Sequence, residues 1–225
     1  AKVLYDAAHM SGMIAGKAWQ QPLAEGAHLM TMSTYKSFGG VAGGLVLTDD
    51  AALAERLDAI AYPGLTANFD AAKSAALAIT LLDWKEHGRA YAEEMAATAK
   101  ALALALEAAG LPVHGRQFGF TRSHQLAIEA AAFGGGHRAA KRLRAANMLS
   151  SAIGLPLAAV AGDANGLRLG TNEIVRWGMG PGDMPDLARF IARALTGNQA
   201  EASMGDLAAE GSRFRRRFNR LHFIH

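Results

Sequence analysis

The sequence contains no cysteine, six prolines in 225 residues, and only 7% aromatic residues. The absence of cysteine excludes disulfides, thiol catalysis and metal sites with cysteine ligands. No apolar run reaches the ~18 residues that a transmembrane helix needs, and no signal peptide is visible. We therefore expect a cytoplasmic protein with no membrane partner.

A large surplus of charge is also lacking. The formal net charge is +3, and most of the excess lies in one segment near the C-terminal end. This segment contains Arg213, Arg215, Arg216, Arg217 and Arg220. The rest of the chain is close to neutral, so we expect no nucleic-acid partner. Phe214 and Phe218 share one helical face in this segment, which leaves binding to an anionic surface as an alternative to a solvated tail.

Hydrophobic residues make up 51% of the sequence, which is enough for a substantial core. Short apolar runs predict strands at 2–6, 27–34 and 44–48, and helical patterns follow at about 50–60 and 70–106. The second helical pattern is predicted to be two helices interrupted at His87-Gly88. Strands that alternate with helical connections predict an α/β fold with a mostly parallel sheet.

The composition changes at Gly110-Leu111-Pro112, which predicts a domain boundary. Residues 1–109 are expected to form part of a large domain with a long linking helix. Residues 110–197 are predicted to form a small α+β domain, with strands at 112–116, 124–130, 150–155 and 167–170. Residues 198–225 are expected to be a poorly ordered basic tail. Because the sequence opens on the apolar strand Val3-Leu4-Tyr5, we expect that an N-terminal portion of the protein is missing.

The first candidate site is Asp6-Ala7-Ala8-His9, at the end of the first strand. Open α/β sheets bind ligands at the carboxyl ends of their strands. A buried carboxylate there needs a cationic partner such as a protonated pyridine nitrogen, and His9 could stack on a flat ring. The alternative is an aspartate that caps a turn, with an unrelated histidine beside it.

The second candidate is Lys36, which lies between a strand and a glycine loop. A lysine amine forms a Schiff base with an aldehyde cofactor when it is partly desolvated. The hydroxyls of Ser33, Thr34 and Ser37 could bind a phosphate or orient the cofactor ring. The alternative is a solvated lysine in a surface turn.

The third candidate is Arg168, which is unusual as an arginine inside a short apolar strand. Its planar guanidinium suits bidentate binding of a substrate carboxylate. A structural ion pair with an aspartate or glutamate is the alternative.

Together these stretches resemble the serine hydroxymethyltransferases of the fold type I aminotransferase superfamily. Asp6 to Gly12 resembles the family's D-x-A-H-x-x-G segment, Ser33 to Gly40 its lysine loop, and Gly166 to Thr171 its G-[LI]-R-[LIV]-G-T motif. The resemblance covers about residues 1–196 and implies the C-terminal half of the large domain plus the small C-terminal domain.

The resemblance also implies roles for these residues. Asp6 would hold the nitrogen of pyridoxal phosphate, His9 would stack on its ring and assist catalysis, and Lys36 would carry the cofactor. Arg168 would bind the carboxylate of the amino-acid substrate. The implied reaction is Cα–Cβ cleavage of serine, glycine or an α-substituted serine, with tetrahydrofolate as a further cofactor and a homodimer as the assembly.

Three departures from the family pattern point away from the folate-dependent reaction of serine and glycine. Tyr35 stands where the family usually has histidine, and Met32 interrupts its run of threonines. A glycine-rich stretch is replaced by Leu65-Thr66-Ala67-Asn68. A relative that acts on α-methylserine is therefore one alternative. Another is an incomplete chain that is inactive without a partner chain carrying the N-terminal half.

The remaining histidines show no spacing typical of metal ligands, so the sequence predicts no metal site. They include His28, His87, His114, His124 and His137.

Overall fold

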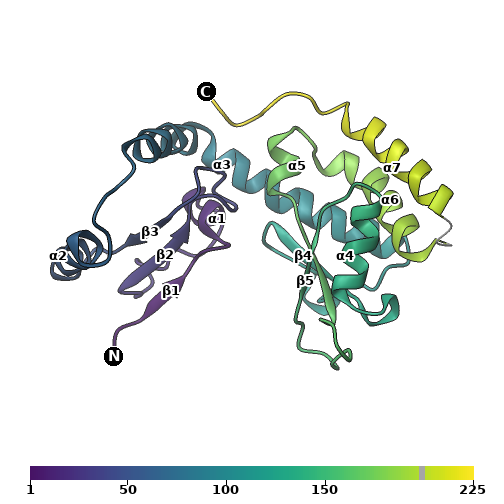
Figure 1. Ribbon diagram of the computed structural model, residues 1–225, viewed down its shortest axis with the longest axis horizontal. Coiled ribbons are helices and arrows are strands. Elements are labelled where there is room, and N and C mark those ends of the chain that lie inside the picture. The colour runs from purple at the N-terminus through teal and green to yellow at the C-terminus, as the bar shows by residue number, and fades with distance from the viewer. Residues whose placement is uncertain (198–200) are drawn as a thin grey trace. The chain divides into compact units, whose positions relative to one another are not determined.

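The computed structural model describes residues 1–197 and 201–225, in two compact units (Figure 1). Unit 1 comprises Ala1–Glu93 and Phe223–His225, and unit 2 comprises Glu94–His222. Unit 1 contains β1 (Leu4–Asp6), α1 (Ser11–Ala15), β2 (Leu29–Ser33), β3 (Gly44–Leu47), α2 (Ala51–Ala59) and the first part of α3 (Ala71–Ala108). Unit 2 contains the rest of α3, β4 (Gln125–Glu129), α4 (Gly136–Ala145), β5 (Ser151–Ile153), β6 (Gly166–Gly170), α5 (Asn172–Arg176), α6 (Met184–Thr196) and α7 (Glu201–Arg215).

The sheet of unit 1 has the strand order β1-β2-β3. Strands β1 and β2 are parallel, whereas β3 is antiparallel to β2. The expectation of a mostly parallel sheet is therefore wrong for β3. Residues 34–43 turn the chain back without a helix, and a parallel neighbour needs a longer crossover connection.

Helix α3 runs without interruption through His87-Gly88, where the sequence predicted a break. Gly88 serves packing there. A Cβ atom at Gly88 would lie 2.6 Å from Cε3 of Trp84, and one at Gly16 would lie 2.4 Å from the carbonyl oxygen of Gly88. Gly88 therefore leaves room for the Trp84 ring of its own helix, and Gly16 lets the end of α1 approach α3 closely.

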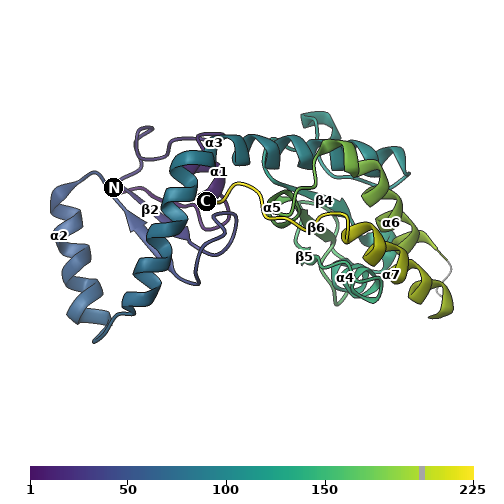
Figure 2. The same ribbon diagram turned by 90° about the horizontal axis from the view of Figure 1, so that it is seen from above.

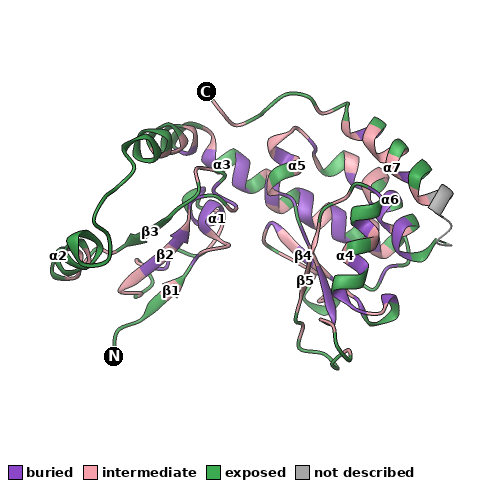
Figure 3. Ribbon diagram, in the orientation of Figure 1, coloured by how far each residue is buried: buried purple, intermediate pink, exposed green. Residues whose placement is uncertain are grey.

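Much of unit 1 is exposed, as the green ribbon of α2 and β3 in Figure 3 shows. Helix α2 buries no residue, and Figures 1 and 2 both show it standing away from the strands of its own unit. The first part of α3, Ala71–Asp83, also buries none. Large apolar side chains between these two helices, such as Leu65 and Phe69, are 81% and 82% exposed.

The sheet of unit 2 has the order β4-β6-β5 and is antiparallel throughout. The strand predicted at 112–116 is reduced to one bridge between Val113 and Ile128. Gly115 then adopts a positive φ of 81° and a short 3-10 helix, Arg116–Phe118, follows. Only glycine enters this left-handed conformation without strain, so the chain leaves the sheet here.

Unit 2 encloses a continuous hydrophobic core between its sheet and its helices. Helix α6 shows the pattern well, because Met184, Ala188, Ile191 and Leu195 face inward at helical spacing. The later part of α3 contributes a similar stripe, which includes Leu102 and Leu106. Figure 3 shows these inward faces in purple.

The tail predicted to be poorly ordered instead carries helix α7. Leu207 and Phe214 lie seven residues apart on this helix and are both buried, and the Phe214 ring lies 5.5 Å from that of Phe190. The many arginines lower the mean hydropathy of the segment, so these two apolar residues gave no helical pattern in the sequence. Residues 198–200 of the predicted tail lie outside the described residues. Among the helices that the structure describes, none has the length and hydropathy needed to span a membrane.

Candidate functional site

Three of the residues singled out in the sequence, Asp6, His9 and Lys36, lie close together in unit 1. Strands β1 and β2 are parallel neighbours with Asp6 paired to Thr31, so the loops that follow both strands leave the same edge of the sheet. His9 lies in the turn after β1, and Lys36 lies in the loop after β2. The order of the strands thus gathers these side chains.

Asp6 is exposed at the end of β1, and one of its two oxygens is already engaged. Its Oδ1 accepts hydrogen bonds from the backbone N–H of Ala8 at 2.9 Å and from the hydroxyl of Thr31 at 3.5 Å. Its Oδ2 makes no hydrogen bond within residues 1–197 and 201–225. This second oxygen can therefore accept a hydrogen bond from an N–H or O–H of a bound group.

Lys36 is half-buried, and its Nζ lies 3.4 Å from Nε2 of His9. The same amine lies 5.9 Å from the ring centre of Tyr35. No carboxylate forms an ion pair with Lys36 in the described part of the chain. An amine that no carboxylate engages can approach the aldehyde of a cofactor.

Ser37 ties the two loops together. Its hydroxyl donates to the carbonyl oxygen of His9 at 2.8 Å and accepts from the N–H of Gly12 at 3.0 Å. A Cβ atom at Gly12 would lie 2.4 Å from the carbonyl oxygen of Ser37. Glycine at position 12 and serine at position 37 together allow the loops to approach this closely. Through this contact, Ser37 positions His9 next to Lys36.

The lysine loop is also held to α3. The ring of Phe38 stacks on that of Trp84 with centroids 5.1 Å apart, and Trp84 Nε1 donates to the carbonyl oxygen of Phe38 at 2.8 Å. Both side chains are buried. Sequence reasoning missed Trp84, because nothing local links it to a loop 46 residues earlier.

The two hydroxyl residues proposed as cofactor contacts differ in their surroundings. Ser33 is half-buried at the end of β2. Thr34 is 2% exposed, and its hydroxyl donates to the carbonyl oxygen of Val41 at 2.5 Å. The hydroxyl of Thr34 therefore shapes the glycine loop in this structure.

Arg168 lies in unit 2, in the central strand β6. Its neighbours across the sheet are Ala127 and Ser151, and its Nε donates to the hydroxyl of Ser151 at 3.1 Å. The structural ion pair considered as an alternative is not present among the described residues. The terminal nitrogens of the guanidinium therefore remain for a carboxylate ligand.

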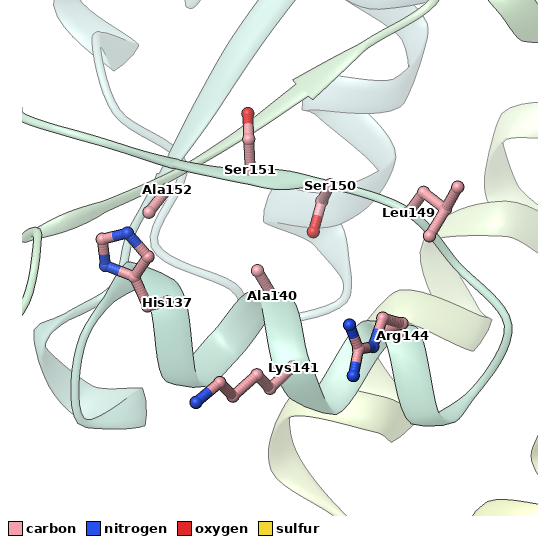
Figure 4. Close-up of a pocket in the computed structure, with 8 residues that line it drawn as sticks. All are labelled: His137, Ala140, Lys141, Arg144, Leu149, Ser150, Ser151 and Ala152. Atoms are coloured by element: carbon pink, nitrogen blue, oxygen red, sulfur yellow. The ribbon is translucent and has the colours of Figure 1, made fainter.

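A basic pocket of about 380 Å³ lies next to β5 (Figure 4). Its lining residues of basic type are His137, Lys141 and Arg144 of α4. Figure 4 shows the hydroxyls of Ser150 and Ser151 pointing to opposite sides of the strand. Ser151, whose hydroxyl accepts from Arg168, thus directs this hydroxyl away from that of Ser150, and it also lines the pocket.

Asp163 lies beside this pocket, at the N-terminus of α4. It accepts from the backbone N–H of His137 at 2.9 Å and of Arg138 at 3.2 Å, and its Oδ1 lies 2.6 Å from Nδ1 of His137. These contacts, above all the N–H of His137, lower the pKa of Asp163 to about 2. The sequence contained no signal for this cap, because Asp163 lies 26 residues after His137.

The family model for serine hydroxymethyltransferase matches residues 1–191. The chain belongs to the serine hydroxymethyltransferase family. The resemblance drawn from the three motifs is thus confirmed, and members of this family generally depend on pyridoxal phosphate.

Several curated relatives carry a more specific name. The chain is 62% identical over 224 residues to an "Alpha-methylserine aldolase" of Variovorax paradoxus and 58% identical over 224 residues to one of Ralstonia sp. Each alignment covers 100% of this chain and 50% of the relative. A serine hydroxymethyltransferase of Methanopyrus kandleri is 44% identical over 88% of this chain and 46% of its own length.

Among solved structures, the L-threonine transaldolase of Pseudomonas fluorescens matches with a TM-score of 0.87 and 27% identity. The match covers 100% of this chain and 51% of that chain. The chain therefore has the mixed α/β fold of about half of such an enzyme, and it spans about half the length of the curated relatives it matches.

The residues of unit 1 fit pyridoxal phosphate by their chemistry. A lysine amine without a counter-ion suits its aldehyde, and a carboxylate with an unengaged oxygen suits its protonated nitrogen. Both groups lie at the same edge of one sheet.

Proposed function

We propose that this chain supplies the cofactor-carrying lysine of an enzyme that cleaves the Cα–Cβ bond of an α-substituted serine such as α-methylserine. The observation that carries the proposal is the 3.4 Å contact between Lys36 Nζ and His9 Nε2, at the sheet edge that also presents Asp6. The names of the relatives at 58–62% identity support the choice of substrate.

The reaction needs one proton removed and one supplied. The β-hydroxyl of α-methylserine loses its proton, Cβ leaves as formaldehyde, and Cα gains a proton to give alanine. Pyridoxal phosphate, when bound, supplies an aldehyde for an amine and a ring that accepts the electron pair of the broken bond.

The residues of the chain have separate tasks in this proposal. Lys36 holds the cofactor, and Asp6 keeps a proton on the ring nitrogen through its Oδ2. His9 would stack on the ring of the bound cofactor and would accept or return a proton at Lys36 Nζ, which lies 3.4 Å from its Nε2. Arg168 binds the carboxylate of the substrate, which orients the bond to be broken.

Serine and glycine are the competing substrates, and the departures at Met32 and Tyr35 favour a different one. Met32 is 7% exposed and belongs to the apolar side of β2, so no threonine hydroxyl exists at this position. Tyr35 is 54% exposed, beside Lys36, in place of the usual histidine. Turnover of α-methylserine in the absence of tetrahydrofolate would favour an α-substituted serine over serine or glycine as the substrate.

A second candidate function is that of one half of a two-chain enzyme. Twelve large apolar side chains of unit 1 are exposed, from Val3 and Leu4 to Leu81 and Leu82. The half of the relatives that this chain does not span is a natural cover for them. In this case the chain binds pyridoxal phosphate stably, and turns over substrate, only with a partner that carries that half.

The test is the absorbance of lysine-bound pyridoxal phosphate, with and without the co-expressed other half of an α-methylserine aldolase. We expect a band in the visible region that Lys36→Arg abolishes. Lys73→Arg, on the exposed part of α3, is the matched control and should keep the band. A band that survives Lys36→Arg would refute the assignment. A band that requires the other half would favour the two-chain enzyme.

A further inference from the structure

A second cluster of reactive side chains lies in unit 1, outside the site described above. Glu86 and His87 of α3 meet His225, which lies in the segment Phe223–His225. One ligand atom of each residue falls within 4.8 Å of the others. The sequence offered no metal-ligand spacing, because His225 reaches this place from the far end of the chain. We propose that Glu86, His87 and His225 bind a divalent transition-metal ion, with zinc as the best fit.

The segment Phe223–His225 is fixed next to α3 by two contacts that do not involve the cluster. The ring of Phe223 stacks on that of Tyr91, with centroids 5.1 Å apart. The backbone N–H of His225 donates to Asp83 Oδ1 at 2.9 Å. Asp83 and Tyr91 lie on α3 before and after the two helical ligands, so His225 is held next to them. The donor set is therefore built by tertiary contacts and is not a chance approach of loose side chains.

The distances suit a small tetrahedral ion. Nε2 of His225 lies 3.3 Å from Oε2 of Glu86, and Nε2 of His87 lies 3.6 Å from Oε1. Zinc–nitrogen bonds of about 2.0–2.1 Å in a tetrahedron place neighbouring ligand atoms roughly 3.3–3.4 Å apart. The two imidazole rings lie side by side, tilted by 53° with centroids 5.7 Å apart. Two imidazoles and one carboxylate leave a fourth position for water, as in many zinc sites.

The alternative is a pair of ordinary histidine–glutamate ion pairs. The three side chains are 31% to 57% exposed, and ion pairs at such exposure contribute little to stability. A metal ion would use both imidazoles and the carboxylate as ligands at once. Binding of zinc by the chain therefore distinguishes a metal site from a pair of ion pairs.

A bound ion would fasten the segment Phe223–His225 to α3. The role is structural, since the cluster shares no residue with Asp6, His9 or Lys36. Ligand binding to the folded state alone raises the unfolding temperature. Zinc is therefore expected to stabilise unit 1 independently of pyridoxal phosphate.

The experiment is calorimetric titration of the chelator-treated full chain with zinc sulfate. We expect one zinc ion per chain, with an affinity that falls about tenfold or more in His87→Ala and in His225→Ala. The matched control is His114→Ala, which removes a histidine paired with Glu129 in unit 2 and should leave the affinity unchanged. His225→Cys keeps a zinc ligand and should retain binding, which separates loss of a ligand from loss of structure.

Circular dichroism of each variant confirms that it is folded. Wild-type chain that binds no zinc at pH 8 would overturn the proposal. So would affinities in His87→Ala and His225→Ala that equal those of the wild type and of His114→Ala.

Discussion

The two units of this chain differ in how they use their hydrophobic residues. Unit 2 closes a core of its own, in which residues such as Ile128, Leu143 and Leu167 are 0% exposed. Unit 1 holds Asp6, His9 and Lys36 but leaves α2 and the first part of α3 without a buried residue. The unit that carries the candidate chemistry is therefore the one that lacks a complete core. We infer that further protein covers its apolar surfaces and also completes the proposed site.

Replacing one buried and one exposed isoleucine with alanine should show the largest difference between the two units. Ile128→Ala in unit 2 should lower the free energy of unfolding by about 2–5 kcal/mol, because it leaves a cavity between packed strands. Ile79→Ala makes the same change on α3, where the side chain is 59% exposed, and should stay within about 0.5 kcal/mol. Urea unfolding followed by circular dichroism gives both values.

Similar losses for the two isoleucines would break the comparison. A larger loss for Ile79→Ala once the other half of a relative is bound would sharpen it, since the side chain would then be buried.

Substitution of two helical glycines compares a packed position in unit 1 with an open position in unit 2. In Gly88→Ala the new methyl group meets the ring of Trp84, and overpacking of this kind costs about 1–3 kcal/mol. Gly205→Ala, in α7, meets no atom within 4 Å and should stabilise the helix by about 0.5–1 kcal/mol. Thermal unfolding of the two variants should shift in opposite directions. A stabilising Gly88→Ala would contradict the tight contact between position 88 and the ring of Trp84.

Acid should act on unit 2 through Asp163. Its pKa is lowered from 3.8 to about 2, so the stability it contributes is present above pH 4 and is lost as pH falls toward 2. Asp163→Asn should therefore flatten the dependence of the urea midpoint on pH between 4 and 2. Asp206→Asn, on the exposed side of α7, is the control and should leave the wild-type slope. An unchanged slope in Asp163→Asn would show that other carboxylates govern acid unfolding.

The smallest effect is expected for a surface ion pair in unit 1. Arg89 Nε lies 2.9 Å from Glu93 Oε1, but the side chains are 79% and 58% exposed. Arg89→Ala should change the free energy of unfolding by less than about 0.5 kcal/mol, and high salt should remove even that difference. A loss above 1 kcal/mol would mean that α3 is covered here by protein.

Local sequence patterns predicted much of the fold and the grouping of one candidate site. Strands β1 and β2 are short apolar runs, and parallel strands end at one sheet edge, so Asp6, His9 and Lys36 had to lie near one another. Their roles remain proposals. The antiparallel course of β3 depended on a connection without a helix, which apolar content alone does not reveal.

Long-range contacts explain what the sequence could not predict. Trp84 supports the lysine loop across 46 residues, and His225 contacts Asp83 across 142. Helix α7 was hidden because Leu207 and Phe214 are only two apolar anchors among many charges. Such contacts depend on tertiary packing and produce no periodic pattern of hydrophobic residues in the local sequence.

The most direct test of the central claim is to locate the lysine that holds the cofactor. The chain, together with the other half of an α-methylserine aldolase, is loaded with pyridoxal phosphate, reduced with borohydride and digested, and the labelled peptide is identified by mass spectrometry. The account predicts that most labelled molecules carry the label on Lys36. A label on Lys73, Lys85 or Lys100, or none at all, would contradict it.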